Sequence, residues 1–191
     1  MGNRQYERPS PDRPSGACTL GRSSPPLPVW PSSEHGIFVD SKDNVWIAGN
    51  SRVPGRADLP WATNKEGGDG FVLKFDMNGN FKMRVGGTPT KPDSNDKQGG
   101  INGTPVLFQA TDFAEDVAAG RMYISDGYGN RRVVVFDKNG KYLRQWGRQA
   151  TVEETQQGVA GAFSQVVHCI AMGNDGLIYV CDRQGDRIQV F

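Results

Sequence analysis

The only two histidines of this 191-residue chain stand at the start of similar aliphatic blocks. His35 opens HGIFVD, and His168 lies in VVHCIA. Imidazole nitrogens are common Zn²⁺ ligands, and a catalytic zinc site takes three protein ligands and leaves a fourth position open. Scattered surface histidines would rarely take equivalent places in two blocks. The pair therefore predicts metal ligation by His35 and His168, although two histidines alone make an incomplete site.

The blocks that must position these histidines belong to a repeated module of short strands. Its best-preserved copy covers residues 109–146, where β-branched and aromatic residues fill the strands and Gly, Asn and Asp fill the gaps. Strands are predicted from 112, at 121–125, at 132–136 and at 141–146. The DKNG segment between the last two strands contains Asn-Gly, which predicts a type I′ hairpin.

The same module occurs before and after this copy. Equivalent second strands carry an aromatic residue at Trp46, Tyr123 and Tyr179, and third strands end with Phe75, Phe136 and Phe191. A repeat of roughly 40–60 residues with four antiparallel strands is typical of a β-propeller blade. A sandwich or open meander is the alternative, but it would not require the same turns and aromatics three times.

The predicted fold class is therefore all-β, a β-propeller of four-stranded blades. About three blades are expected, at residues 33–87, 109–148 and 164–191, the last without its fourth strand. Propellers usually close with four to eight blades, so we expect the chain to be a fragment of a longer protein. A three-bladed protein that completes its ring by oligomerising is the alternative. Residues 1–29, rich in Pro, Arg and Ser, are predicted to be disordered.

Composition narrows the classes of partner. The formal net charge is +1 with both signs mixed along the chain, which gives no electrostatic reason to expect nucleic acid or an anionic membrane surface. No apolar run approaches the length of a membrane span. Cys169 and Cys181 lie on two strands joined by a short turn, so they could face each other, but two small buried thiols are the favoured interpretation.

The blocks ISDGYGNRRVVVF and YVCDRQGDRIQVF resemble NHL repeats. Within that group, residues from about 30 to 191 are most similar to the peptidyl-α-hydroxyglycine α-amidating lyases. This resemblance implies a six-bladed propeller that cleaves a carbinolamide to an amide and glyoxylate. A small-molecule or peptide substrate would occupy a central channel with zinc, and further blades would complete the ring. The resemblance extends to a structural calcium ion and to a secreted or periplasmic location.

The resemblance also assigns individual residues. It makes His35 and His168 two of three histidine ligands from alternate blades, with Thr111 at the matching place of the blade between them. It identifies Tyr128 in SDGYGN as the catalytic tyrosine and Arg183 in CDRQGDR as an active-site arginine. From the residues alone, Tyr128 could instead pack between blades, and Arg183 could pair with a nearby aspartate.

The chain also departs from the family pattern. The third histidine and a neighbouring methionine would lie beyond Phe191, and a further active-site arginine would belong to a blade before His35. Two functions follow as hypotheses: a zinc-dependent lyase, or a non-catalytic propeller that binds a protein or another ligand, because fold does not fix function. Four charged residues recur at equivalent places and are expected to be structural, tying strands and turns of neighbouring blades: Asp126, Asp182, Arg132 and Arg187.

Overall fold

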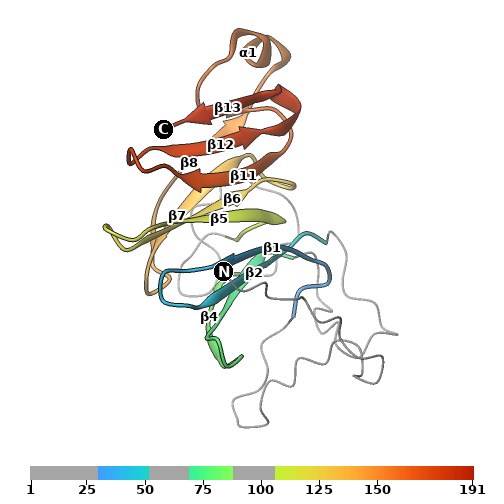
Figure 1. The fold of residues 1–191 in the computed structure, drawn as a ribbon. Coiled ribbons are helices and arrows are strands. Elements are labelled where there is room, and N and C mark those ends of the chain that lie inside the picture. The colour runs from blue at the N-terminus through green and yellow to red at the C-terminus, as the bar shows by residue number, and fades with distance from the viewer. Residues whose placement is uncertain (1–29, 52–68, 88–105) are drawn as a thin grey trace, which may run out of the picture.

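The computed structural model describes residues 30–51, 69–87 and 106–191, which form three antiparallel sheets (Figure 1). In each sheet the strands pair in the order of the chain. The first sheet contains β1 (Glu34–Val39), β2 (Val45–Gly49), β3 (Phe71–Phe75) and β4 (Phe81–Gly86). The second contains β5 (Ala110–Asp116), β6 (Arg121–Asp126), β7 (Arg132–Asp137) and β8 (Tyr142–Trp146). The third contains β11 (Val167–Met172), β12 (Ile178–Asp182) and β13 (Arg187–Val190).

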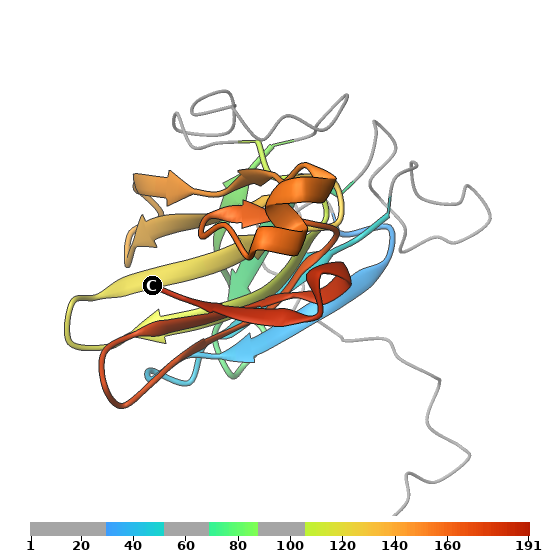
Figure 2. The ribbon, with the colours of Figure 1, turned by 90° about the horizontal axis from the view of Figure 1, so that it is seen from above.

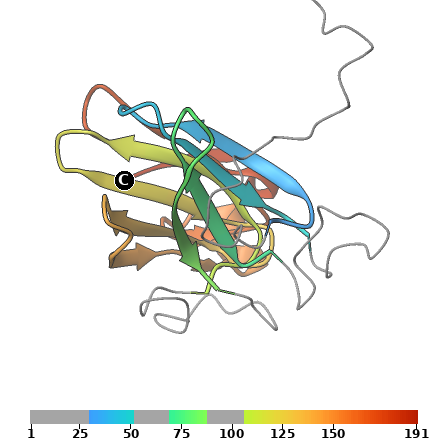
Figure 3. The same ribbon diagram turned by 90° about the horizontal axis from the view of Figure 1, so that it is seen from below.

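The three sheets are stacked face to face, and their first strands lie side by side. β5 contacts β1 on one side and β11 on the other, as Figure 1 shows. Figures 2 and 3 show the same stack from its two ends, with the third sheet in front in one view and the first sheet in front in the other. Four-stranded antiparallel sheets in this arrangement are the blades of a β-propeller. The all-β propeller prediction is confirmed.

The middle blade is buried on both faces, which explains its uninterrupted apolar strands. Successive side chains of a strand point to opposite faces. Accordingly, Val134 and Phe136 of β7 pack against the first blade, whereas Val133 and Val135 pack against the third. All four are fully buried. The resulting two apolar layers hold the inner strands at a fixed spacing, on which any site between them depends.

The turn between β7 and β8 differs from the predicted type I′ hairpin. A type I′ turn needs positive φ at both central residues, but here only Gly140 has positive φ (79°) and Asn139 does not. The backbone N–H of Gly140 donates to the carbonyl of Asp137, and the β7–β8 pairing shifts directly after the turn. The Asp137 carboxylate accepts the N–H groups of Asn139 and Lys141. These bonds to the side chain favour a longer turn closed by a bulge.

For the connection between the second and third blades, the sequence predicts a loop over 147–162 in which EETQQ could form a helical turn. The structure has three short elements there. They are β9 (Arg148–Gln149), α1 (Val152–Gln157) and β10 (Ala162–Phe163), and β9 pairs with β10 in parallel. A capping box starts α1: Thr151 accepts the N–H of Glu154, and the Glu154 carboxylate accepts the N–H of Thr151. Across the described ranges, no helix is long and apolar enough to cross a membrane.

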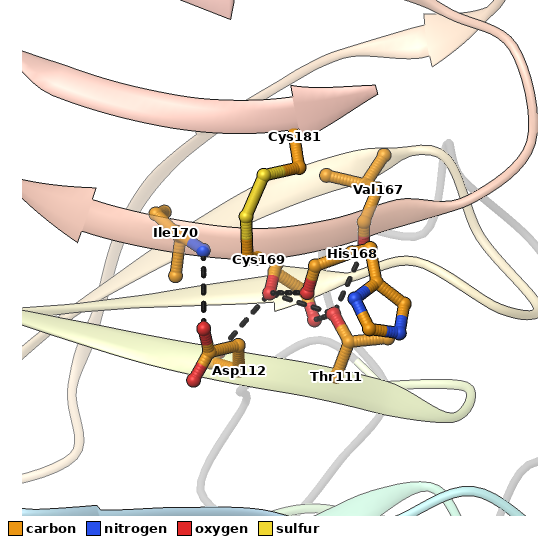
Figure 4. The surroundings of a disulfide bond; sticks show 8 residues. Thr111, Asp112, Val167, His168, Cys169, Ile170 and Cys181 are labelled. Atoms are coloured by element: carbon orange, nitrogen blue, oxygen red, sulfur yellow. Dashed lines mark hydrogen bonds between the residues drawn. A yellow bond between two sulfur atoms is a disulfide. The ribbon is translucent and has the colours of Figure 1, made fainter. Parts of the chain in front are cut away.

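Cys169 and Cys181 form a disulfide between β11 and β12 (Figure 4), so the expectation of two buried thiols was wrong. The two cysteines lie on neighbouring antiparallel strands with their Cα atoms 5.0 Å apart, within the range that a disulfide needs. The sequence also predicts a long polar loop at 86–106, on the surface or at the mouth of a channel. Most of this loop, like residues 1–29, lies outside the described residues.

Candidate active site

Every inner strand carries a bulge at the same place. The pairing with the second strand shifts between Glu34 and Ile37, between Ala110 and Asp112, and between Val167 and Ile170. The shifted positions contain His35 in β1, Thr111 in β5 and His168 in β11. A bulge adds a residue to one strand and turns a side chain out of the regular alternation. The fold thus presents one irregular position per blade at equivalent points of neighbouring inner strands.

His35, His168 and Tyr128 meet at one point. The Tyr128 hydroxyl lies 3.3 Å from Nε2 of His35 and 3.3 Å from Nε2 of His168. The two imidazole centroids are 5.5 Å apart, and each ring stands edge-on to the Tyr128 ring. All three side chains are half-buried. The structure therefore brings together three predicted residues that are separated by 93 and 40 positions in sequence.

The fourth predicted residue, Arg183, reaches the same point from the third blade. It begins the short 3₁₀ helix Arg183–Gly185 after β12. Its Nη1 donates to the Tyr128 hydroxyl at 3.4 Å, and its guanidinium carbon lies 5.5 Å from the centroid of the Tyr128 ring. The side chain is exposed. Arg183 thus faces solvent beside Tyr128 and is free to bind an anionic group that approaches it.

The Tyr128 loop is held by main-chain contacts and by one arginine. Tyr128 N–H donates to the carbonyl of Gln109. Nη1 of Arg131 donates to the carbonyls of Gly127, Tyr128 and Asn130. A Cβ at Gly129 would lie 1.7 Å from the Phe108 ring, so only glycine fits there. Arg131 was not among the predicted site residues, because an arginine within a loop has no periodic pattern that would mark it.

The neutral form of His168 is favoured by its surroundings. Burial lowers the pKa of His168, and the nearby His35 and Arg183 lower it further, whereas Asp112 acts in the opposite direction. A neutral imidazole carries the lone pair that a metal ion requires, while imidazolium does not. The site therefore keeps His168 available as a ligand or a proton acceptor at neutral pH.

The tautomer of His35 follows from its hydrogen bond. Nδ1 of His35 lies 3.2 Å from the carbonyl oxygen of Thr111. A carbonyl can only accept, so Nδ1 carries the proton and Nε2 of the neutral ring presents its lone pair toward Tyr128. In zinc proteins a ligating histidine usually donates its other ring N–H to a carbonyl or carboxylate in this way. The Nε2 lone pair of His35 thus points toward the Tyr128 hydroxyl, which Nε2 of His168 also faces.

Two imidazoles that converge on one point fit a metal ion as part of its ligand set. Within residues 30–51, 69–87 and 106–191 there is no group of three or more His, Cys, Asp and Glu side chains that could hold a metal. The described residues thus offer two nitrogen ligands with a tyrosine hydroxyl beside them. Further ligands would have to come from outside this set.

The recurring aspartates and arginines behave as expected for structural residues. Asp126 and Arg132 form an ion pair at 2.9 Å with both side chains fully buried, and Asp182 pairs with Arg187 at 3.0 Å. Each pair joins the second and third strands of one blade, and both arginines also donate to carbonyls of the segment that enters their blade. The sequence suggested links between blades, but the ion pairs lie within one blade.

The first blade uses a carboxylate that the sequence pattern hid. Gly49 takes the place equivalent to Asp126, so the second strand of this blade has no aspartate there. Asp69, from just before β3, fills this space: a Cβ on Gly49 would lie 2.5 Å from its carboxylate. Asp69 accepts the N–H groups of Ser32, Ser33 and Ser51. The first blade therefore has a carboxylate at this place, although the residue that supplies it comes from a different position in the sequence.

Comparison with known proteins agrees with this fold. No protein-family model matches the chain. Peptidyl-glycine alpha-amidating monooxygenase A of Xenopus laevis is 40% identical over 160 residues, which cover 82% of this chain and 14% of that protein. The B form from the same organism is 38% identical over 160 residues, 82% of this chain and 15% of that protein. The chain thus spans about one seventh of the length of these relatives.

The fold has a counterpart among solved structures. A Bacteroides thetaiotaomicron protein of unknown function superposes with a TM-score of 0.51 and 16% identity, covering 78% of this chain and 32% of that one. Identity this low bears on the fold alone. Together with the sequence relatives, it leads to one conclusion: the described residues of this chain form β-propeller blades, and the chain is homologous, over about four fifths of its length, to part of the peptidyl-glycine alpha-amidating monooxygenases.

Proposed function

We propose that this chain contributes part of the active site of a zinc-dependent peptidyl-α-hydroxyglycine α-amidating lyase. In this proposal His35 and His168 are two of the zinc ligands, Tyr128 moves the proton, and Arg183 binds the substrate carboxylate. The observation that carries the proposal is the meeting of these four side chains around the Tyr128 hydroxyl. The homology to the amidating monooxygenases supports it.

The reaction would break one C–N bond without a change of oxidation state overall. The substrate is an amide whose nitrogen is bonded to a carbon that carries a hydroxyl and a carboxylate. Tyr128 would take the hydroxyl proton as the carbonyl of glyoxylate forms, and the amide nitrogen would leave with a proton. Atoms balance, since the proton lost by the hydroxyl is the one that the amide nitrogen gains.

Tyr128 needs help to act as a base, because an ordinary tyrosine has a pKa of about 10. The guanidinium of Arg183 lies within hydrogen-bonding distance of its oxygen, where it would stabilise negative charge that develops during proton transfer. The same guanidinium can offer two parallel N–H donors to a carboxylate, which is the geometry in which arginine binds such groups best. A zinc ion held by the two imidazoles would supply Lewis-acid polarisation of a substrate oxygen.

The remaining parts of such a site would come from elsewhere. A third ligand is needed for a three-histidine zinc site, and we propose that further blades supply it and enclose the channel that holds the small-molecule or peptide substrate. The Cys169–Cys181 disulfide supports a secreted or periplasmic location, because disulfides persist in oxidising compartments.

The proposal is tested by assaying the full-length protein for glyoxylate release from an α-hydroxyglycine-extended peptide. His35→Ala should abolish turnover and lower zinc content. Tyr128→Phe should reduce kcat by about 10²–10⁴-fold, the usual contribution of a general acid or base, with zinc content unchanged. Tyr179→Phe is the matched control, because its hydroxyl bonds only to Asp175 on the exposed β11–β12 turn. It should leave kcat and KM unaltered.

Each result has a distinct meaning. Zinc bound stoichiometrically with no glyoxylate released would eliminate the lyase and favour a propeller that binds a partner without catalysis. Equal zinc content in the wild type and in His35→Ala would remove the histidines from the ligand set.

A further inference from the structure

Thr111 contacts both histidine-bearing strands at the histidine positions, through its main-chain carbonyl and through its hydroxyl. It lies in the middle blade with only 2% of its surface exposed. Its carbonyl oxygen accepts the bond from Nδ1 of His35 in β1. Its hydroxyl lies 2.8 Å from the carbonyl of Val167, the residue before His168 in β11. Figure 4 shows Thr111 directly below the start of β11, beside the His168 ring.

A second buried hydroxyl completes the connection. Oγ of Ser125 lies 2.7 Å from Oγ1 of Thr111 and 3.3 Å from the carbonyl of His168. Each hydroxyl has one proton, so not every short contact can be a bond at once. The Thr111 hydroxyl also lies 2.9 Å from the carbonyl of Ser125, so this carbonyl and that of Val167 compete for its one proton. The shortest consistent chain has Ser125 donating to Thr111 and Thr111 donating to the Val167 carbonyl. Both side chains are buried, so these donors have no competing water.

Two glycines let the three strands approach this closely. A Cβ on Gly36 would lie 2.4 Å from the Thr111 carbonyl oxygen, and a Cβ on Gly127 would lie 1.8 Å from the Val167 carbonyl oxygen. Both contacts are with backbone atoms that cannot rotate away. The carbonyls of Thr111 and Val167 are thus packed against glycines, and their positions are set by the hydrogen bonds that they accept.

We propose that Thr111, supported by Ser125, is a positioning residue that sets the separation and orientation of His35 and His168. The inference rests on the proposed function insofar as the histidines are zinc ligands. Through its carbonyl Thr111 fixes the tautomer and ring direction of His35. Through its hydroxyl it fixes the main chain immediately before His168. Its position in the middle blade therefore does more than separate two ligand-bearing blades.

The matched pair Thr111→Val and Thr111→Ser isolates the hydroxyl, because valine keeps the shape of threonine and serine keeps the donor. Zinc affinity is measured on the 191-residue chain by competition with a chelating dye. Thr111→Val should weaken affinity by about tenfold, the lower end of what outer-shell changes cost, and Thr111→Ser should stay within about twofold of the wild type. Thr155→Val removes a comparable hydroxyl that bonds Ser164 at the edge of α1, and should leave affinity unchanged.

A second readout needs no metal. His35 and His168 are the only histidines, and their ring centroids lie 5.5 Å apart, so an NMR cross-relaxation peak between their ring protons should appear in the wild type and in Thr155→Val. It should weaken or vanish in Thr111→Val. An unchanged peak together with unchanged zinc affinity in Thr111→Val would overturn the inference. If wild-type zinc binding does not exceed that of His35→Ala, the metal proposal fails, and the ring-proton peak alone decides the positioning role.

Discussion

At the scale of single residues, the site depends on how closely the main chains of neighbouring blades approach. His35 reaches the carbonyl of Thr111 only because Gly36, the next residue, has no side chain in the path of that carbonyl. The same holds for Gly127 and the carbonyl of Val167. These glycines are needed for space and not for an unusual backbone conformation, since neither has positive φ.

Gly36→Ala should therefore destabilise the fold and misplace His35. Its Cβ would sit 2.4 Å from a backbone oxygen, so β1 and β5 must separate. We expect a loss of about 1–3 kcal/mol in the free energy of unfolding, as for other overpacked sites, measured by urea titration. Gly120→Ala meets no atom within 4 Å and reports the cost of its positive φ alone. Unchanged stability of Gly36→Ala would show that the sheets can move apart freely.

Asp40 offers a pH-dependent contribution to stability. Burial alone would raise its pKa, but hydrogen bonds from Lys74, Trp46 and Asn44 outweigh that effect and hold the pKa well below its usual range. The carboxylate lies 2.9 Å from the Lys74 ammonium. In the unfolded chain an aspartate titrates near a pKa of about 3.9. The stabilisation is thus complete above that pH and is lost as the pH falls toward the lower folded-state pKa.

Asp40→Asn should cost on the order of 2 kcal/mol at pH 7, the range for a hydrogen bond to a charged group. The gap to the wild type should narrow as the pH falls from about 4 to 2, in unfolding experiments at several pH values. Asp76→Asn is the control, because Asp76 caps a similar turn but is solvated and lies 3.8 Å from Lys82. Its effect should be smaller. A gap that stayed constant from pH 7 to pH 2 would contradict this reasoning.

At the scale of elements, the strands and their repeat were predictable because alternation and turn residues are local signals. The strand at 132–136 was found within one residue of β7, and the registers of Tyr123 and Tyr179 are equivalent. The turn type at Gly140 was not predictable from Asn-Gly alone, since the Asp137 carboxylate selects the longer turn. For α1 the sequence offered only the EETQQ piece as a possible helical turn, because six residues give no periodicity that would assign a helix.

The buried ion pair of the middle blade gives an element-level prediction. Arg132→Met leaves the Asp126 carboxylate buried without its cation, which should cost about 3–5 kcal/mol in the free energy of unfolding. Arg187→Met makes the same change in the third blade, where the arginine side chain is 17% exposed and water can partly replace it. Its loss, measured by the same denaturant titration, should be smaller. A larger loss for Arg187→Met would reverse our ranking of the two pairs.

At the scale of the whole molecule, the predicted site residues came together because propeller symmetry places equivalent positions side by side. His35, His168, Tyr128 and Arg183 could be named from sequence through the resemblance to a family. Thr111 and Arg131 could be assigned their contacts only from the structure, because carbonyl oxygens carry no sequence signal. Asp69 illustrates the same limit: its carboxylate lies beside Gly49, where the other two blades have an aspartate at the end of the second strand, and no sequence pattern marks this.

The disulfide closes a loop of the third blade and should be detectable by thiol counting. Alkylation of the denatured, unreduced protein should leave two of the three cysteines, Cys169 and Cys181, unmodified. Replacing Cys169 and Cys181 together by alanine should lower the free energy of unfolding by about 2–3 kcal/mol, as expected for a loop this short. Modification of three thiols in the unreduced protein would be incompatible with the disulfide.

The bulge shared by the three inner strands has a consequence for how such a protein can change. Because the extra residue lies outside the regular pairing, its identity is not dictated by the alternation that packs the blades. One blade can hold an imidazole there and its neighbour a hydroxyl while the sheets remain superimposable. In such a propeller, a substitution at the bulge position of one blade can change the functional group that this blade presents, while the residues that pack the core stay the same.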